Sequence, residues 1–147
     1  MSPDTVSIET IIHAPVEKVW DAWTQADLVL KWFGSDPDGS GIKAILDIRQ
    51  GGNFEITFAD ADGTQHTCFG VYKEVVKPHR LSFTWTWKSE PATESFVSVK
   101  LMSANEFTRM IFEHARVGTG SAHNYIAGWK TTFEKLKWLF ENSPFNN

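Results

Sequence analysis

Residues 80–88 read RLSFTWTWK and residues 121–142 read SAHNYIAGWKTTFEKLKWLFEN, and these two stretches decide the fold. In the first stretch every second residue is apolar, which is typical of a β-strand with one apolar face. The residues on that face are Leu81, Phe83, Trp85 and Trp87. In the second stretch apolar residues recur at helical spacing, so it predicts an amphipathic helix that Pro144 ends. A strand and a helix with large aromatic faces are expected to pack together.

The predicted terminal helix carries one apolar stripe along its whole length. The stripe consists of Ala122, Tyr125, Ile126, Trp129, Phe133, Leu136 and Phe140. At 1.5 Å per residue this helix would be roughly 33 Å long, enough to cross a whole sheet. Trp138 falls on the opposite face, and we expect it to pack against a neighbouring segment rather than form an exposed partner surface. Gly118 and Gly120 precede the helix; they read as a flexible entry with Ser121 as cap, and an anion site at the helix start is the alternative.

The remainder of the chain predicts one strand, two short helices and six further strands. The opening strand is Val6–Ile12, Pro15 suits the first turn of a helix that continues through Trp23, and a second helix covers Ala26–Trp32 with Gly34 as its C-terminal cap. The six strands are expected at Ala44–Arg49, Asn53–Ala59, Gln65–Val76, Arg80–Lys88, Ser95–Ser103 and Phe107–Ala115. Their short, turn-like connections predict an antiparallel meander.

Composition limits the class of protein. A chain of 147 residues predicts a single domain over residues 1–147. The net charge of -4 and the lack of a Lys/Arg cluster argue against nucleic-acid binding. There is neither an apolar run of membrane-spanning length nor a signal peptide, and the lone Cys68 excludes an internal disulfide. We therefore expect a cytoplasmic protein, monomeric or homodimeric.

Several short motifs, in this order and spacing, resemble one known family. They are Ala14-Pro15 with Val19-Trp20, Trp32-Phe33-Gly34, Asp47-x-Arg49-x-Gly51-Gly52-x-Phe54, Gly70-x-Tyr72, Pro78-x-Arg80-Leu81-x-Phe83-Thr84-Trp85, Thr108, His114 and Gly128-Trp129. Together they cover almost the whole chain, about Ile8 to Leu139. The pattern is similar to the branch of the START-related, birch-pollen-allergen-like superfamily that is named after the activator of the heat-shock protein 90 ATPase.

This resemblance implies an α+β helix-grip fold. A curved antiparallel sheet of about seven strands would wrap around the long C-terminal helix, with two short helices after the first strand. The resemblance also implies a cavity between sheet and helix that binds a hydrophobic small molecule. Some relatives are cyclases, aromatases or hydrolases, and the eponymous members stimulate a chaperone. Fold alone therefore leaves three functions open: ligand binding, an enzyme in the same cavity, or a protein-interaction module.

The aromatic faces supply the candidate ligand site. Its predicted residues are Trp32, Phe54, Ile56, Phe83, Trp85, Val99, Met110, Phe112, His114, Tyr125, Trp129 and Phe133. Each of them separately is more typical of a packed core. As a set around a concave sheet they favour an apolar pocket for an aromatic, polyketide-like or lipid-like molecule.

His114 is the main polar candidate because it shares strand parity with Met110 and Phe112. The sequence favours a structural histidine bonded to backbone or to Tyr125; the alternative is a neutral imidazole that hydrogen-bonds a ligand or acts as an acid or base. No second catalytic group lies at a telling spacing and no Gly-x-Ser-x-Gly elbow occurs, so we assign no catalytic residue and no cofactor.

The sequence gives little indication of a metal site or a redox site. Asp36–Asp47 imitates a calcium-binding EF-hand loop, but Lys43 replaces an apolar residue, the exit is β-patterned, and the last ligand is Asp instead of Glu. No histidine pair has metal-ligand spacing, so no metal is expected. Asp47 and Arg49 could form a structural ion pair, with Arg49 orienting an anionic ligand group as the alternative. Cys68 reads as a small buried residue.

Overall fold

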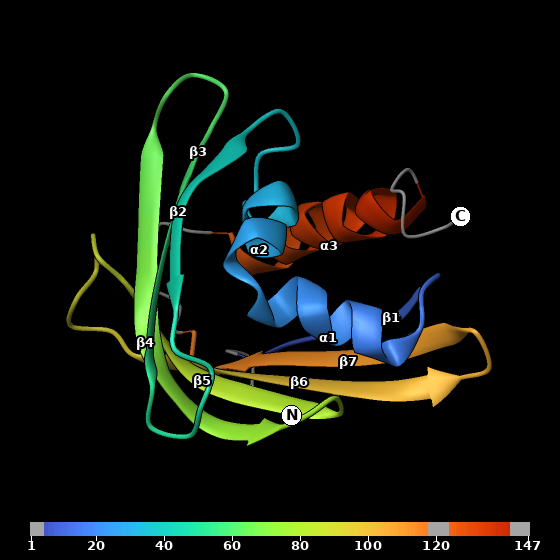
Figure 1. Cartoon of the computed structure of the whole chain (residues 1–147). Helices are drawn as coiled ribbons and strands as arrows, with labels where there is room; N and C mark the ends of the chain where they lie inside the picture. The colour runs from blue at the N-terminus through green and yellow to red at the C-terminus, as the bar shows by residue number, and fades with distance from the viewer. Residues whose placement is uncertain (1–4, 118–123, 142–147) are drawn as a thin grey trace.

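A curled sheet of seven antiparallel strands encloses three helices on its concave side, as the computed structural model of the chain shows (Figure 1). The structure describes residues 5–117 and 124–141. The elements, in chain order, are β1 Val6–Ile12, α1 Val16–Thr24, α2 Ala26–Trp32, β2 Ser40–Leu46, β3 Asn53–Ala59, β4 Gln65–Val76, β5 Arg80–Trp87, β6 Ser95–Ala104, β7 Phe107–Ala115 and α3 Tyr125–Glu141. This arrangement is the helix-grip fold that the sequence predicted.

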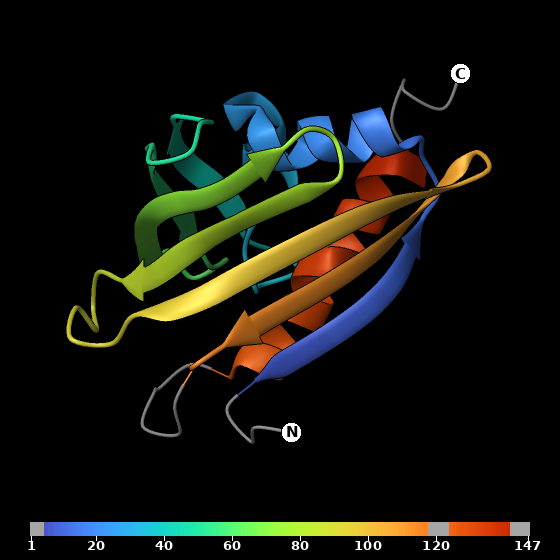
Figure 2. The same ribbon diagram turned by 90° about the horizontal axis from the view of Figure 1, so that it is seen from below.

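The strand order in the sheet is β1-β7-β6-β5-β4-β3-β2, so β2 to β7 form a meander and the first strand joins beside the last. The register of that closing pair places Val6 opposite His114 and Ile12 opposite Thr108. The sheet bends between its β2–β4 part and its β5–β7 part (Figure 1). The helix α3 crosses the strands of the second part on their inner side (Figure 2).

Most element boundaries lie where the sequence predicted them, and β2 is the main exception. A strand was predicted here, but its predicted bounds, Ala44–Arg49, were wrong. The strand β2 covers Ser40–Leu46, and Ser40 pairs with Ala59 on β3. The glycines of this segment favoured a loop, but Gly41 is needed in the strand, because a Cβ there would lie 2.5 Å from the carbonyl oxygen of Leu30. Residues 47–52 form the turn instead, closed by the bond from the Gly52 amide to the Arg49 carbonyl.

The apolar stripe of α3 packs onto the sheet through Trp129, Phe133, Leu136 and Phe140, all of which are buried. Ile126 is 54% exposed, so its predicted place in the buried stripe was wrong. It lies in the first turn of α3, where the packing that buries Phe133 does not extend to it. The predicted cap Ser121, the stripe member Ala122 and the glycines at 118 and 120 lie outside the described residues, as does Pro144.

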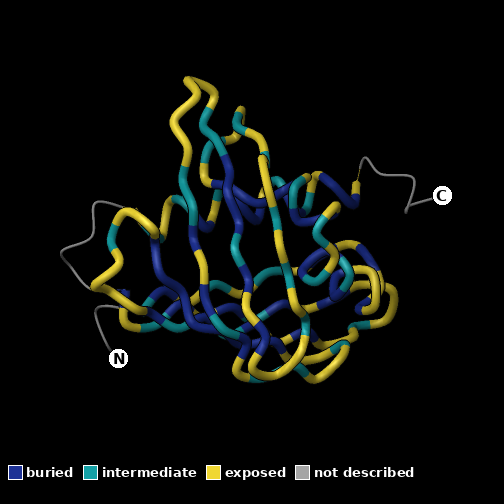
Figure 3. The backbone as a smooth tube through the Cα atoms, turned by 60° about the vertical axis from the view of Figure 1, so that its left-hand side comes forward, coloured by how far each residue is buried: buried dark blue, intermediate teal, exposed yellow. Residues whose placement is uncertain are grey.

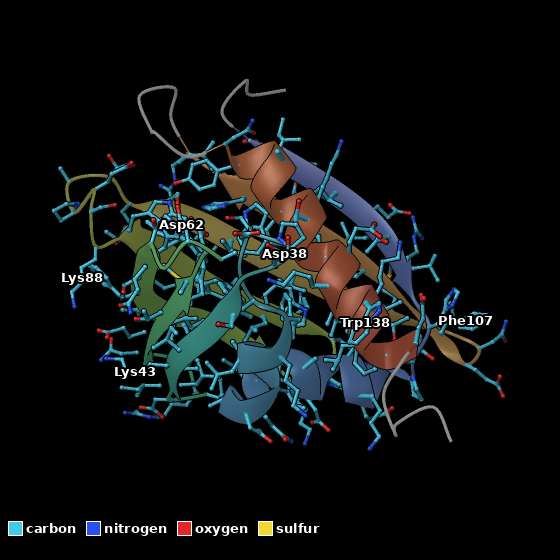
Figure 4. All side chains as sticks on the ribbon, turned by 90° about the horizontal axis from the view of Figure 1, so that it is seen from above. Asp38, Lys43, Asp62, Lys88, Phe107 and Trp138 are labelled. Carbon is cyan, nitrogen blue, oxygen red and sulfur yellow. The ribbon has the colours of Figure 1, made fainter. Side chains whose placement is uncertain are left out.

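Trp138 is 65% exposed, so it is not buried against a neighbouring segment as the sequence predicted. Figure 4 labels it near the C-terminal end of α3, on the side of the helix that faces away from the sheet. The reason lies in the helical period. The positions that α3 buries are 129, 132, 133, 136, 139 and 140, and at about 100° per residue position 138 points away from their mean direction.

A second row on α3 holds the segment after α2. Gly128, Thr132 and Lys135 lie side by side on the helix at i, i+4 and i+7. The Thr132 hydroxyl lies 2.9 Å from the Gly34 carbonyl and 2.7 Å from that of Gly128, and Lys135 Nζ donates to the carbonyls of Gly34 and Asp36 at 3.1 and 3.0 Å. A Cβ on Gly128 would lie 3.3 Å from Ser35 Cβ, so glycine permits this close approach.

One continuous apolar core fills the space between the sheet and the helices, while the hairpin tips are exposed (Figure 3). The two short helices contribute three of its tryptophans, Trp20, Trp23 and Trp32. Trp23 of α1 stacks on Phe112 with 6.4 Å between ring centroids, and it meets Trp32 of α2 edge-on at 4.9 Å. Phe133 of α3 packs against Phe112 at 4.9 Å. Helices α1 and α2 therefore occupy much of the room that the curled sheet encloses.

Candidate functional site

A pocket of about 70 Å³ opens where the first turns of α3 face the end of α2 and strands β3 and β5. Most of its walls are aromatic. The lining residues are Phe33, Gly34, Ser35, Phe58, Trp85, Trp87, Asn124, Tyr125, Gly128, Trp129 and Thr132. Because none of these side chains carries a charge, the described walls suit an uncharged, apolar guest.

The aromatic walls are held in place by one another. Trp85 lies 5.3 Å from Trp129 and 5.9 Å from Phe33, measured between ring centroids. At the rim, Trp87 Nε1 donates a hydrogen bond of 2.7 Å to the Tyr125 hydroxyl oxygen. This bond ties β5 to the first turn of α3, so the pocket is built across two elements that are far apart in the sequence.

Beyond this pocket the space between helix and sheet is closed. A second void measures about 10 Å³ and lies among residues of β3 and β5 and of the two short helices. That is roughly the minimum needed to hold one water molecule. The sequence predicted a roomy cavity between the sheet and the long helix, whereas in the structure Trp23, Trp32 and Phe133 pack together in the middle of that space.

The structure divides the predicted ligand residues into three groups. Trp85, Tyr125 and Trp129 line the 70 Å³ pocket. Phe54, Ile56 and Phe83 line the 10 Å³ void. The rest are buried and line neither space: Trp32, Val99, Met110, Phe112, His114 and Phe133. Trp32, for example, uses its indole N–H to bond the Ala22 carbonyl at 2.9 Å.

Several pocket residues were absent from the predicted set. Phe58 and Trp87 belong to the same strand faces as Ile56 and Trp85, so extending those faces to the strand ends would have found them. Phe33, Gly34 and Ser35 follow α2, and no periodicity marks them. Thr132 lies beside the apolar stripe of α3, and only the position of the Gly34 carbonyl explains why a polar residue is buried there.

His114 is fully buried, and its partners differ from those that the sequence predicted. Its Nε2 lies 2.6 Å from Ser95 Oγ, and its Nδ1 accepts a bond of 3.0 Å from Trp129 Nε1. The Tyr125 ring meets His114 edge-on at 4.8 Å, with no hydrogen bond between them. Burial lowers the pKa of His114 to about 3, because the charged ring would lose its hydration there.

Two indole N–H groups in the core have no hydrogen-bond partner within the described part of the chain. They belong to Trp23 and Trp85, which are 4% and 3% exposed. A buried donor without a partner costs about 1–3 kcal/mol. Trp85 is therefore both a wall of the pocket and a buried donor without a partner among the described residues.

The remaining candidates from the sequence are structural. Arg49 pairs with Asp47 at 2.9 Å in an exposed turn that does not line the pocket. Cys68 is buried as predicted, and burial raises the pKa of its thiol. Asp36 accepts bonds from the amides of Asp38 and Ala61. Across residues 5–117 and 124–141, no three His, Cys, Asp or Glu side chains gather as a metal site would require.

Larger hollows exist only as shallow surfaces among the described residues. One of about 450 Å³ lies on the outer face of the sheet, beside the exposed Ile45 and Phe69. Another of about 710 Å³ lies along Thr64–Thr67 and Lys88–Glu90. Both face outward, so the smaller pocket under α3 encloses a guest better. None of the helices in the described ranges combines the length and apolar character of a membrane span.

Comparison with solved structures shows the same fold in several other proteins. The AHSA1-like protein from Aeromonas hydrophila is 25% identical, with 96% of this chain and 94% of that chain covered and a TM-score of 0.81. Protein NE0264 from Nitrosomonas europaea is 24% identical, with 97% of each chain covered and a TM-score of 0.80. DynU16, a protein of the dynemicin biosynthetic locus, is 22% identical, with 98% of this chain and 50% of that chain covered and a TM-score of 0.78.

A search of curated proteins returned no match. The family model described as Activator of Hsp90 ATPase homolog 1-like protein matches residues 13–141, which include α1, α2, the meander and all of α3. This range contains every residue that lines the pocket. The chain therefore belongs to the family of proteins similar to activator of Hsp90 ATPase homolog 1.

Proposed function

We propose that this protein binds a small, uncharged aromatic molecule in the pocket between α3, the end of α2 and strands β3 and β5. The observation that carries the proposal is the wall itself: the described residues around about 70 Å³ include six aromatic side chains and none that is charged. Aromatic guests pack well against rings in offset or edge-to-face geometry, which adds about 0.5–1.5 kcal/mol per pair to the burial of apolar surface. None of the described lining residues would offer a cation to the carboxylate of a fatty acid.

The volume of the pocket limits the size of the guest. An engineered apolar cavity of about 150 Å³ binds benzene, and this pocket offers about half that volume. It is open on one side, so part of an aromatic ring can enter the pocket while the remainder of the guest stays at the rim. A polyketide-like molecule would be held by one end. The suggestion that this fold binds a polyketide-like molecule rests on the neighbour from the dynemicin biosynthetic locus.

Nuclear magnetic resonance of the tryptophan indole N–H groups tests this proposal. Toluene, indole and naphthalene should shift the signals of Trp85, Trp87 and Trp129 and leave that of the exposed Trp138 in place. Decanoate, which is apolar but anionic, should produce weaker shifts. A ligand of seven to ten heavy atoms is expected to reach a Kd of about 1 mM or tighter, which corresponds to about −4 kcal/mol.

A rim variant provides the control. Ser35 is exposed at the pocket mouth, so Ser35→Phe should block the site while the fold persists. Ser89→Phe adds the same ring at an exposed position in the β5–β6 turn and should leave binding unchanged. The proposal fails if none of the three ring compounds moves the wall signals, or if both variants bind them equally well.

A second candidate function rests on Trp138. A tryptophan that is 65% exposed is unusual on a protein surface and is a common anchor in protein interfaces. The family name describes an activator of the Hsp90 ATPase, and an exposed anchor on α3 supports a protein partner of that kind. Stimulation of a purified Hsp90 ATPase by this chain, lost in Trp138→Ser, would favour this function; no stimulation at all would remove it.

A further inference from the structure

A buried chain of hydrogen bonds runs from β5 to α3 beneath the pocket. Ser95 Oγ donates to the Trp85 carbonyl oxygen at 3.2 Å and lies 2.6 Å from His114 Nε2. On the other side of the ring, Trp129 Nε1 donates to His114 Nδ1 at 3.0 Å. Ser95, His114 and Trp129 are all buried, with exposed fractions of 2%, 0% and 5%. We call this chain the Ser95–His114–Trp129 relay.

The partners fix the position of every proton in the relay. An indole N–H can only donate, so His114 Nδ1 must be the acceptor and carries no proton. A neutral imidazole then has its proton on Nε2, and this N–H donates to Ser95 Oγ. The serine hydroxyl is left with its own proton, which it donates to the Trp85 carbonyl. Each donor has one acceptor, and no alternative direction satisfies all three bonds.

This assignment removes the resemblance to a catalytic serine–histidine pair. A histidine activates a serine by accepting its hydroxyl proton, which requires an unprotonated nitrogen toward the oxygen. Here the nitrogen toward Ser95 already holds a proton, and the free nitrogen is occupied by Trp129. The enzyme alternative therefore has no activated nucleophile at this point of the structure.

Both ends of the relay are walls of the pocket. Trp85 supplies the carbonyl that accepts the first bond, and Trp129 supplies the indole that donates the last. Their rings lie 5.3 Å apart, and the Tyr125 ring, which also lines the pocket, rests edge-on against His114. The position of the His114 ring thus sets the distance and angle between the strand wall and the helix wall.

We propose that His114, held in its Nε2-protonated neutral form, is the positioning residue of the pocket: it fixes the Trp129 indole against Trp85 and thereby sets which guest shapes fit. This inference rests on the proposed function for its ligand part, and on the hydrogen bonds alone for its positioning part. A second proton on the ring would sit on Nδ1, facing the Trp129 N–H, and would break that bond.

The surroundings of the ring favour the neutral form. The elements packed against it contribute Val6 from β1, Val97 and Ser95 from β6, Trp85 from β5, and Tyr125 and Trp129 from α3. Tyr125 is the one titratable group in that set of described neighbours, and it is uncharged at neutral pH. Without a carboxylate to stabilise it, a charged ring is disfavoured by burial.

The first test needs no ligand. In a ¹⁵N-histidine-labelled sample, His114 should show a protonated Nε2 and an unprotonated Nδ1, and its signals should stay constant between pH 8 and pH 5. A proton on Nδ1, or a ring that titrates near the usual histidine pKa of 6.5, would overturn the assignment and with it the positioning role.

The second test measures pocket shape with toluene and naphthalene as probes. His114→Leu removes both bonds and should move the Trp129 indole signal and change the ratio of the two affinities by about fivefold to tenfold, which is the effect of about one hydrogen bond. His114→Asn places an amide oxygen near the former Nδ1 and should restore the Trp129 signal. An unchanged affinity ratio in His114→Leu would refute the specificity role.

Thr108→Val is the matched control for this series. Thr108 lies on the same strand, is fully buried and bonds the Ala14 carbonyl at 2.8 Å, but it does not line the pocket. Its variant should lose stability and leave the Trp129 signal and the affinity ratio as they were. If neither probe binds the wild-type chain, the proposed function and the specificity role fail together, whereas the tautomer and the Trp129 signal still decide whether the relay holds the indole.

Discussion

Two neighbouring parts of the buried stripe on α3, around Trp129 and around Phe133, have the same aromatic character and opposite packing. Around Phe133 the rings of Trp23, Trp32 and Phe112 close the space. Around Trp129, one turn earlier, the facing segment presents Gly34 and Ser35 after Phe33, and about 70 Å³ stays open. Aromatic content therefore does not decide whether a helix-grip fold keeps a pocket. The size of the residues that the short helices and their following segment present to α3 decides it.

The largest loss of stability is expected in the closed part of the stripe, around Phe133. Phe133→Ala removes a ring that is 3% exposed and packed against four other aromatic rings. The free energy of unfolding should fall by about 3–5 kcal/mol, because a cavity remains where the ring was. Urea denaturation measures this loss. Phe69→Ala, which removes the same atoms from a side chain that is 37% exposed on the outer face, should cost less than half as much. Equal losses would show that the interior is not as tightly packed as described.

The pH dependence of the free energy of unfolding tests the buried neutral state of His114 in the relay. The folded state holds His114 neutral with a pKa of about 3, whereas the unfolded chain protonates it below its ordinary pKa of 6.5. The unfolded state therefore binds more protons between these values, and stability must fall as the pH falls through this window. From pH 7 to pH 5 the loss should be about 2 kcal/mol.

The difference between wild type and His114→Leu in denaturant melts at pH 7 and pH 5 isolates this contribution. The carboxylates whose pKa values the fold lowers, such as Glu55 and Asp62, are already ionised in both states above pH 5 and contribute little in this window. A pH dependence that is identical in wild type and variant would contradict the buried neutral histidine.

A smaller loss of stability is expected in the row of Gly128, Thr132 and Lys135, which holds the segment after α2 beside the pocket. Thr132→Val replaces a hydroxyl that bonds the Gly34 carbonyl at 2.9 Å with a methyl group of similar size. Because Lys135 Nζ also bonds that carbonyl, the oxygen keeps a partner, and the cost should be about 1 kcal/mol. Thermal or chemical denaturation gives the value. A loss as large as that of Phe133→Ala would mean that this row, rather than ring packing, anchors α3.

The smallest effect is expected at Trp138. Its side chain is mostly in solvent, so Trp138→Ala should change the free energy of unfolding by no more than about 0.5 kcal/mol. A denaturant titration is sufficient to measure it. A loss above 1 kcal/mol would show that the ring contributes to the packing of α3 and would weaken its use as a partner anchor.

The sequence predicted the architecture well because strand alternation and helical spacing are local signals. The helix α2 and the strands β3, β4 and β7 have the predicted bounds, and the antiparallel order follows from the short turns. The strand β2 was misplaced because its Gly39-Ser40-Gly41 sequence is typical of a turn, while the tertiary approach of Leu30 requires glycine in the strand. The local preference of these residues for a turn was therefore outweighed by the contact between Gly41 and Leu30.

The site was less predictable because volume is not a local property. Periodicity placed Trp85 and Trp129 on inward faces, but it could not show that α1 and α2 insert Trp23 and Trp32 into the same space. Nor could spacing pair His114 with Ser95, which is 19 positions away on the neighbouring strand. The inward direction of His114 was predictable, whereas its partners depend on the register between β6 and β7, on the backbone of β5 and on the docking of α3.

The lone cysteine offers a way to follow the two halves of the sheet separately. Cys68 lies between Ile56 and Trp87 on β4, fully buried, with a thiol that burial keeps protonated. A thiol-specific reagent can modify it only after the β3–β5 region opens, and no other sulfhydryl competes for the label. The labelling rate therefore reports the opening of that region alone, and comparison with global unfolding would show whether the hairpin side of the sheet separates before the strands beneath α3 do.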